Sequence, residues 1–490
     1  MLFTSPIFLF IFLPLFLIVY YLVPNTTSAK NSIALLGSIL FFAWGEPIFV
    51  FVLLLGTYID YRISLYIEPK SVIKPVHKKT LLLLGLSLNI FTLIMSKYLT
   101  FIGGTLAPIM HSWFKANLTV PNLPLILGIS FITFHKVSYL VDSYNGRANP
   151  PRHFFDCALY IFLFPQLIAG PIIRYHDIGN QIHAREHSAT GLLSGFLRFS
   201  IGLIKKILIA DTLAIMADKV FNLAPTELSS LFAWGGIVAY TLQIYFDFSG
   251  YSDMAIGLGQ MMGFHFPENF NRPYIACSIT EFWQRWHISL SNWMRLYIYI
   301  PLGGNRGTLL KTYINLWIVF LISGLWHGAS WNFIVWGAYY GFFLSLERAV
   351  TSIPIMKHIV LPNTLRRIIT LLIVIVGWVF FRSPTLSYAM HYILVMFGVN
   401  SAPSQVLPWG SIFNNHAIFT LIIASLIATV VLPKTSIYYP KKLKEVWIKN
   451  PTTSEVQTIS IQFITTLFLL IVSAAAILSS DYTPFLYFRF

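Results

Sequence analysis

Apolar runs, separated by short polar or basic segments, repeat along almost the whole chain. A hydrocarbon core about 30 Å thick needs roughly 20 apolar residues per helix, so these runs predict about ten to twelve membrane-spanning helices. The runs lie near residues 1–23, 33–57, 80–102, 123–141, 154–173, 191–209, 231–264, 313–346, 367–381, 416–432 and 459–478. The first run lacks the basic start and cleavage site of a signal peptide, so we expect it to remain as a span. The pattern predicts an all-α polytopic membrane protein with additional interfacial or re-entrant helices.

The composition supports this fold class and excludes an ordinary soluble domain. Hydrophobic residues make up 56% of the chain and charged residues only 10%, whereas about a quarter of a soluble domain is charged. The formal net charge of +15 comes mainly from connecting segments, so it indicates membrane topology and not a nucleic-acid partner. We expect one membrane-embedded domain over residues 1–490, with its catalytic core at about 154–346 and lipid around it.

Basic residues cluster in two of the connecting segments. They are Arg62, Lys70, Lys74, Lys78 and Lys79 in the first segment, and Lys434, Lys441, Lys442, Lys444 and Lys449 in the second. Such an excess predicts that both segments face the cytoplasm. The two cysteines, Cys157 and Cys277, form no CxxC or Cys/His spacing, so neither a zinc site nor a disulfide framework is indicated.

Two histidines stand out against the apolar background. His327 lies within residues 313–346, which contain no Asp, Glu, Lys or Arg, and His287 follows the tryptophan-rich string 282–286. Because an ionisable group in such a run is costly to bury, His327 is predicted to face a protein-lined cavity and to serve a function. Neutral imidazole can accept a proton and imidazolium can return it, which makes acid–base catalysis a credible role.

Two other roles remain open for this pair. A histidine in a membrane helix can simply hydrogen-bond to a neighbouring helix. Metal binding is the weaker alternative, because the two histidines are 40 residues apart and no carboxylate cluster accompanies them.

The residues around His287 have the pattern of an amphipathic helix. Ser278 and Glu281 have the spacing of a capping box, which predicts a helix start just before the tryptophan string. On a helical wheel, residues 281–295 separate into an aromatic face and a polar face, typical of a helix at a membrane interface. His287 falls at the seam between the faces, one turn from Ser291.

Helix length places His327 within the membrane. From Tyr313 to His327 is 14 residues, or about 21 Å of α-helix, so we expect the histidine to lie deep in the bilayer. Gly324 and Gly328 flank it, which predicts close approach of another helix or of a substrate chain.

Two carboxylates occupy another apolar run, at Asp247 and Asp253. Carboxylates in such runs usually face the protein interior. They are predicted either to orient a catalytic histidine or, with more support, to pair with a buried arginine such as Arg174, Arg272 or Arg285.

Two further segments carry candidate site residues. The run at 154–173 closes with two prolines and a glycine around Gln166, and such breaks are tolerated where the backbone lines a cavity. The glycine-rich loop 303–307 has the wrong order for a phosphate-binding P-loop, but Arg306 and Lys311 are expected near an anionic ligand.

Several strings together resemble the membrane-bound O-acyltransferase superfamily, in particular its alginate O-acetyltransferase branch. The matching strings are Phe164 to Pro171, Tyr245 to Asp253, Asn271 to Tyr274, Thr280 to Ser291, Tyr299 to Arg306, Leu325 to Gly328 and Phe485 to Phe490. The resemblance covers essentially the whole chain. One departure is Arg295-Leu296-Tyr297, where the family commonly has Arg-Asp-Tyr.

The resemblance implies a helical acyltransferase of the bacterial inner membrane with a central tunnel that meets at the two histidines. His327 matches the family's catalytic histidine and His287 its second active-site position, and Trp326, Ser291 and Gln166 are expected to line or orient the tunnel. The donor would be a cytoplasmic thioester such as acetyl-CoA, with no bound cofactor. An extracytoplasmic acetyltransferase or carrier would then modify a polysaccharide.

Three alternatives stay open. Within the family, the acceptor could be peptidoglycan or another exopolysaccharide, or the reaction could be D-alanyl transfer to teichoic acid. From another class, a transporter or export subunit would use His327, Asp247 and Asp253 as a proton relay.

Overall fold

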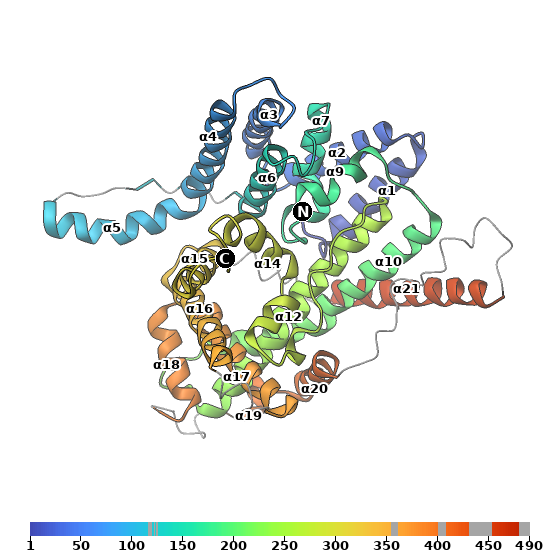
Figure 1. The fold of residues 1–490 in the computed structure, drawn as a ribbon. Coiled ribbons are helices and arrows are strands. Elements are labelled where there is room, and N and C mark those ends of the chain that lie inside the picture. The colour runs from blue at the N-terminus through green and yellow to red at the C-terminus, as the bar shows by residue number, and fades with distance from the viewer. Residues whose placement is uncertain are drawn as a thin grey trace. The chain divides into compact units, whose positions relative to one another are not determined.

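The computed structural model describes residues 1–115, 120, 121, 123, 126–353, 361–399, 408–430 and 453–479. These residues form helices and no strand, which confirms the predicted all-α fold class. They make two compact units (Figure 1): unit 1 comprises 1–199 and 254–267, and unit 2 comprises 200–253 and 268–490. The second predicted basic segment and the string Phe485 to Phe490 lie outside the described residues.

Unit 1 contains the N-terminal helices, several of which join end to end through π-helical turns. They are η1 (Phe8–Phe12), α1 (Leu13–Leu22), α2 (Thr27–Ala43), α3 (Phe49–Ile67), α4 (Pro75–Leu93), η2 (Ile94–Tyr98), α5 (Leu99–Phe114), α6 (Ile129–Tyr144), α7 (Phe154–Phe162), α8 (Phe164–Leu167), α9 (Tyr175–His183) and most of α10 (Ala189–Ile204).

Unit 2 contains the remaining helices and both candidate histidines. They are η3 (Lys205–Ala210), α11 (Asp211–Phe221), most of α12 (Ser230–Met261), η4 (Pro273–Ile275), α13 (Ile279–Arg285), α14 (Ile288–Met294), η5 (Arg295–Tyr299), α15 (Leu309–His327), α16 (Trp331–Ser352), α17 (Asn363–Arg382), α18 (Leu386–Met396), α19 (Trp409–Ile412), α20 (Asn415–Thr429) and α21 (Thr453–Ser479).

Helices of membrane-spanning length and composition occur in both units. Five described segments qualify, namely Phe49–Ile67, Pro75–Phe114, Leu309–His327, Asn363–Arg382 and Ile459–Ser479, and four shorter apolar helices accompany them. This agrees with a membrane protein. The higher number of spans expected from hydropathy stays a prediction.

Several of the predicted apolar runs are divided in the structure, and 313–346 falls on α15 and α16. The run 33–57 is not one helix, because α2 ends at Ala43 and α3 begins at Phe49. Pro47 lies between them, and a proline disfavours helix at the residue before it. The run 154–173 is divided into α7 and the single turn α8, as its prolines predicted.

A buried polar network joins three helices of unit 1. The Lys136 ammonium on α6 lies 3.1 Å from the Asp60 carboxylate on α3, and both side chains are less than a tenth exposed. The Asn89 amide on α4 donates to both carboxylate oxygens, at 3.0 and 3.1 Å. Figure 1 shows these three helices side by side. The network supplies the opposite charge and the hydrogen bonds that a buried carboxylate requires.

In unit 2, α15 packs directly against α16 at the candidate site. Thr308 caps α15 by accepting a hydrogen bond from the Lys311 amide, at 3.3 Å. A Cβ at Gly324 would overlap the backbone oxygen of Phe333 on α16, and one at Gly328 would overlap the Phe333 ring. The close helix approach predicted at these two glycines is therefore confirmed.

Candidate active site

His287 lies at a sharp joint in the chain and not on a continuous helix. The predicted helix over 281–295 is wrong: α13 ends at Arg285, α14 begins at Ile288, and the chain continues from Arg295 as the π-helical η5. His287 has φ 44° and ψ 53°, in the left-handed region. That conformation is uncommon for a residue with a side chain and is concentrated at functional sites. His287 therefore lies at the joint between α13 and α14, and not at the boundary between two faces of one helix.

The predicted start of α13 is confirmed in part. The Ser278 hydroxyl accepts a hydrogen bond from the backbone amide of Glu281, at 3.0 Å. The Glu281 carboxylate accepts from the amide of Cys277, at 2.7 Å, so the return bond reaches one residue further back than in a standard capping box.

Asn269 holds the His287 imidazole. The backbone amide of Ser289 donates to the Asn269 side-chain oxygen at 3.2 Å, and the Ser289 hydroxyl donates to it at 2.9 Å. The Asn269 Nδ2 group donates to the Ser252 hydroxyl at 3.0 Å. A backbone N–H can only donate, so this network fixes which side of the amide is oxygen. That oxygen lies 3.1 Å from Nδ1 of His287.

The hydrogen bond to Asn269 determines the form of the imidazole. Because the amide oxygen only accepts, Nδ1 of His287 must carry the proton. Burial lowers the pKa of His287 to about 3, so the ring is neutral near pH 7. Nε2 then presents a lone pair, and this atom has no hydrogen-bond partner among the described residues. The site thus contains a buried, oriented proton acceptor.

Trp326 connects the two histidines. Its ring centroid lies 6.0 Å from that of His287 and 4.9 Å from that of His327. The His327 ring also has edge contacts with Trp336 on α16 and Phe381 on α17, each at 5.0 Å. Unit 2 therefore brings both histidines and Trp326 into one aromatic site.

The depth expected for His327 in the bilayer stays a prediction. The histidine is the last residue of α15, and Gly328 is in extended conformation beyond it. His327 is buried, with 6% of its surface exposed.

The two carboxylates of α12 pair with lysines that the sequence did not indicate. Asp253 lies 2.6 Å from the Lys205 ammonium, and Asp247 lies 2.9 Å from Lys206. Arg285, one of the predicted partners, instead pairs with Glu281 at 2.8 Å. Arg174, in unit 1, pairs with Asp177. The two carboxylates therefore form the expected ion pairs, but with Lys205 and Lys206. The residue that orients His287 is Asn269.

The other predicted site residues are placed as follows. The Ser291 hydroxyl donates to the backbone oxygen of Trp283, at 3.0 Å, and Ser291 lines a cavity of about 500 Å³ in unit 2. Gln166 belongs to unit 1, where its amide donates to the backbone oxygen of Tyr160. Arg306 is exposed in the loop before α15 and does not line the cavity.

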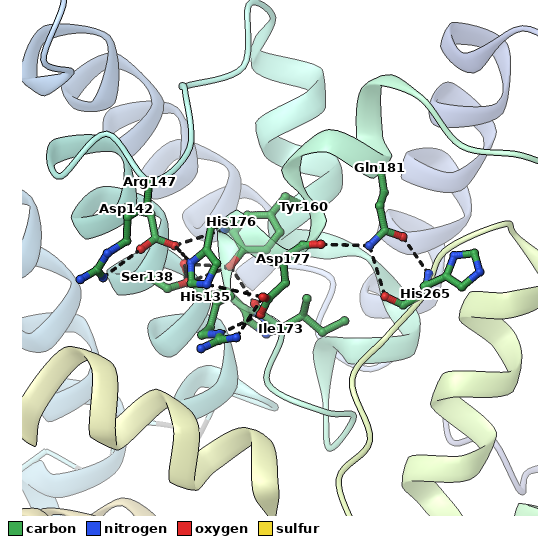
Figure 2. Close-up of polar contacts among 11 residues, drawn as sticks. His135, Ser138, Asp142, Arg147, Tyr160, Ile173, His176, Asp177, Gln181 and His265 are labelled. Carbon is green, nitrogen blue, oxygen red and sulfur yellow. Dashed lines mark hydrogen bonds and ion pairs between the residues drawn. The ribbon is translucent and has the colours of Figure 1, made fainter.

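Unit 1 contains a polar cluster of its own on α6, α7 and α9 (Figure 2). The buried Asp142 carboxylate accepts hydrogen bonds from the backbone amide and Nδ1 of His176, at 3.2 and 2.7 Å, and pairs with Arg147. The Tyr160 hydroxyl lies 2.9 Å from the Ser138 hydroxyl. These contacts tie three helices together, which indicates a structural role.

Comparison with known proteins identifies the family of this chain. The sequence profile of the membrane-bound O-acyltransferase family matches residues 77–391. The chain belongs to this family. It is 45% identical over 397 residues to a protein named probable alginate O-acetylase from Azotobacter vinelandii, which covers 81% of this chain and 78% of that relative.

Two further relatives of this acyltransferase differ in the acceptor that their names give. This chain is 35% identical, over 539 aligned positions, to the peptidoglycan O-acetyltransferase of Helicobacter pylori. The alignment covers 100% of this chain and 98% of that relative. A shorter match, 31% identical over 230 residues, reaches the teichoic acid D-alanyltransferase of Bacillus subtilis and covers 45% of this chain and 58% of that relative. These relationships support O-acyl transfer as the activity, in preference to the transporter alternative.

Sequence reasoning missed Asn269 in this acyltransferase. The residue lies 18 positions before His287, in a segment without regular secondary structure. Its only sequence signal is its place two residues before the string Asn271 to Tyr274, which carried part of the family resemblance.

Proposed function

We propose that this acyltransferase moves an acetyl group from a cytoplasmic thioester, such as acetyl-CoA, for the O-acetylation of an extracytoplasmic polysaccharide such as alginate. It would act as a multi-pass protein of the bacterial inner membrane and pass the acyl group to an extracytoplasmic acetyltransferase or carrier. The observation that carries the proposal is that both imidazoles lie close to the ring of Trp326. The relative named alginate O-acetylase supports the choice of acyl group and polymer.

The reaction needs one group that takes a proton from the acceptor. We assign this role to His327: its imidazole removes the hydroxyl proton while the oxygen attacks the thioester carbonyl. The carbon–sulfur bond then breaks, and the leaving thiolate takes the proton from the imidazolium. The ester and the free thiol are the products, so protons and charges balance.

The role of His287 follows from its hydrogen bond to Asn269. A neutral ring that donates from Nδ1 offers the site a lone pair and no donor. It could polarise an acyl oxygen only after gaining a proton, which its burial opposes. This supports His287 as a second proton acceptor and argues against a role in polarising the acyl oxygen.

The test is the substitution H327A in the producing organism. Loss of a catalytic acid–base group lowers the rate by about 100-fold or more, so polymer acetyl content should fall to the background level while the amount of protein in the membrane stays normal. H416A is the matched control, because His416 is exposed at the start of α20. Polymer that remains fully acetylated in the H327A strain would refute the assignment.

Peptidoglycan is the second candidate acceptor. Its support is the match to a peptidoglycan O-acetyltransferase over the full length of both chains, whereas the match to the alginate O-acetylase covers 81% of this chain. Acetyl content measured separately in isolated peptidoglycan and in exopolysaccharide, with and without the gene, decides between the two.

A further inference from the structure

A cavity of about 550 Å³ lies in unit 1, and its lining residues come from α2, α7 and α9 and from the residue before α7. These three helices pack against one another (Figure 1). Leu36 and Phe155 in the lining are 55% and 70% exposed, so the cavity is open to the surroundings of the helices. In a membrane protein, such an opening beside an apolar helix faces lipid.

One face of α2 changes from polar to apolar along this cavity. Ser28 and Ser32 line the cavity near the start of the helix, and Leu36 and Ile39 line it further along. Residues three or four apart share a helix face, and this face is about 16 Å long from Ser28 to Ile39. Phe155 on α7 adds to its apolar part. A ligand that follows the face would be polar at one end and aliphatic beyond it.

The polar end of the cavity contains a carboxylate without a cation. Asp156, in the first turn of α7, is half-buried and lines the cavity. Its Oδ1 atom accepts a hydrogen bond from Nδ2 of Asn31, at 3.3 Å. Among the described residues, no lysine, arginine or histidine forms an ion pair with this carboxylate. Because a carboxylate shielded from water is stabilised by an opposite charge, Asp156 favours a ligand with a cationic group.

The other polar groups of the lining are neutral hydrogen-bond donors. They are the hydroxyls of Thr27 and Ser28 and the imidazoles of His153 and His183, which can donate to phosphate oxygens. The described residues that line the cavity include no lysine or arginine, the side chains that attract anionic headgroups. One carboxylate beside several neutral donors therefore favours a headgroup with both an ammonium and a phosphate.

We propose that this cavity binds a zwitterionic phospholipid with a primary ammonium, of the phosphatidylethanolamine type. The ammonium lies at Asp156, the phosphate lies at the hydroxyls near the start of α2, and one acyl chain follows Leu36 and Ile39. A primary ammonium has three N–H donors, and its hydrogen bonds to a carboxylate are charge-assisted. The lipid would contact both α2 and α7 and stabilise their packing. This binding requires no acyl transfer, so it is independent of the proposed function.

The experiment measures lipid binding to the delipidated full chain in a neutral detergent. The probes are phosphatidylethanolamine, phosphatidylcholine and phosphatidylglycerol with identical acyl chains. Phosphatidylcholine keeps the positive charge but has no N–H donor, and phosphatidylglycerol has no cation. Phosphatidylethanolamine should bind about tenfold or more tightly than either, the range expected for hydrogen bonds between charged groups. It should also raise the melting temperature, because it binds the folded protein.

Variants connect this preference to the cavity. D156N removes the charge but keeps an oxygen for Asn31, and it should lower the affinity for phosphatidylethanolamine to that for phosphatidylcholine. E186Q is the matched control, because Glu186 is exposed in unit 1 and does not line the cavity. S32W places a bulky ring between the polar and apolar parts of the face, so it should weaken the binding of all three lipids. Melting temperatures without lipid show that each variant is folded.

Two results would overturn the proposal. One is binding of phosphatidylcholine or phosphatidylglycerol as tightly as phosphatidylethanolamine to the unmodified chain. The other is a preference for phosphatidylethanolamine that survives in D156N. Because the readout is lipid binding, neither result bears on acetyl transfer.

Discussion

At the scale of single residues, the chemistry of the site depends on a neutral amide. Asn269 accepts three donors on one oxygen, from Nδ1 of His287 and from the amide and hydroxyl of Ser289. An acceptor that is itself anchored to Ser252 keeps the imidazole in a single tautomer. Asn269 takes up no proton itself, but it determines that Nε2 of His287 is the atom that can accept one.

Replacement of Asn269 by aspartate should change the pH dependence of the reaction. In N269D, a carboxylate beside Nδ1 favours the imidazolium and raises the pKa of His287 by about one unit or more. The lone pair at Nε2 is then lost as pH falls through this higher pKa. We expect the acidic limb of the kcat/KM profile to move to higher pH, with activity restored at alkaline pH.

N269L provides the contrast, because it removes the hydrogen bond without adding charge. Its activity should fall at all pH values, without an upward shift of the acidic limb. An N269D profile that superimposes on the wild-type profile would disprove the link between Asn269 and the protonation of His287.

The sequence was informative about the two histidines and not about Asn269, for a physical reason. An ionisable group in an apolar run is conspicuous because its burial is costly. A neutral amide in a polar connecting segment is ordinary, and its role depends on contacts with residues 17 to 20 positions away in sequence.

At the scale of helices, polar contacts between apolar segments fix which helices pair. Asp60, Lys136 and Asn89 come from three different helices of unit 1. Their bonds are directional, whereas apolar contacts between membrane helices are not. The network therefore selects one arrangement of α3, α4 and α6.

Removal of the cation from this network should be more damaging than removal of both charges. K136M leaves the Asp60 carboxylate buried without its cation and should destabilise unit 1 by about 3–5 kcal/mol. D60N/K136M removes both charges and should recover much of that loss. Thermal unfolding of the purified protein measures the difference, with K79M as the control at an exposed lysine. Equal stability of K136M and D60N/K136M would contradict this prediction, because it would show that the unpaired Asp60 carboxylate does not destabilise K136M.

Helix periodicity predicted some elements and failed at one that matters. The long helix α12 and the break at 163–171 follow from uninterrupted apolar sequence and from prolines, respectively. The joint between α13 and α14 contains neither glycine nor proline at its left-handed position, so the wheel over 281–295 treated two short helices as one.

At the scale of the whole molecule, the basic segments predict how the protein lies across the membrane. The segment between α3 and α4 contains Lys70 and Lys74 against Glu68, and Lys78 follows near the start of α4. This excess of basic residues predicts a cytoplasmic location for the segment. Hydropathy predicted the membrane character, but the number of spans depends on breaks such as the one between α2 and α3. If this segment is cytoplasmic, one more membrane span before it would move the preceding part of the chain to the other side of the membrane.

The location of this segment can be measured directly. In K70C/C277S, the remaining native cysteine, Cys157, is buried, and position 70 is exposed. A membrane-impermeant maleimide should label the variant in inside-out vesicles and not in intact spheroplasts. Labelling in spheroplasts would place this segment outside the cytoplasm.

The left-handed backbone at position 287 also governs how that histidine should be deleted. Alanine would remove the imidazole but keep a Cβ in a conformation that costs about 1–2 kcal/mol. Glycine removes the ring and also relieves that cost. An inactive H287G protein that keeps its melting temperature would report the loss of the imidazole alone, whereas H287A mixes lost chemistry with a residual distortion of the joint. At this position the customary alanine scan is therefore the less interpretable choice.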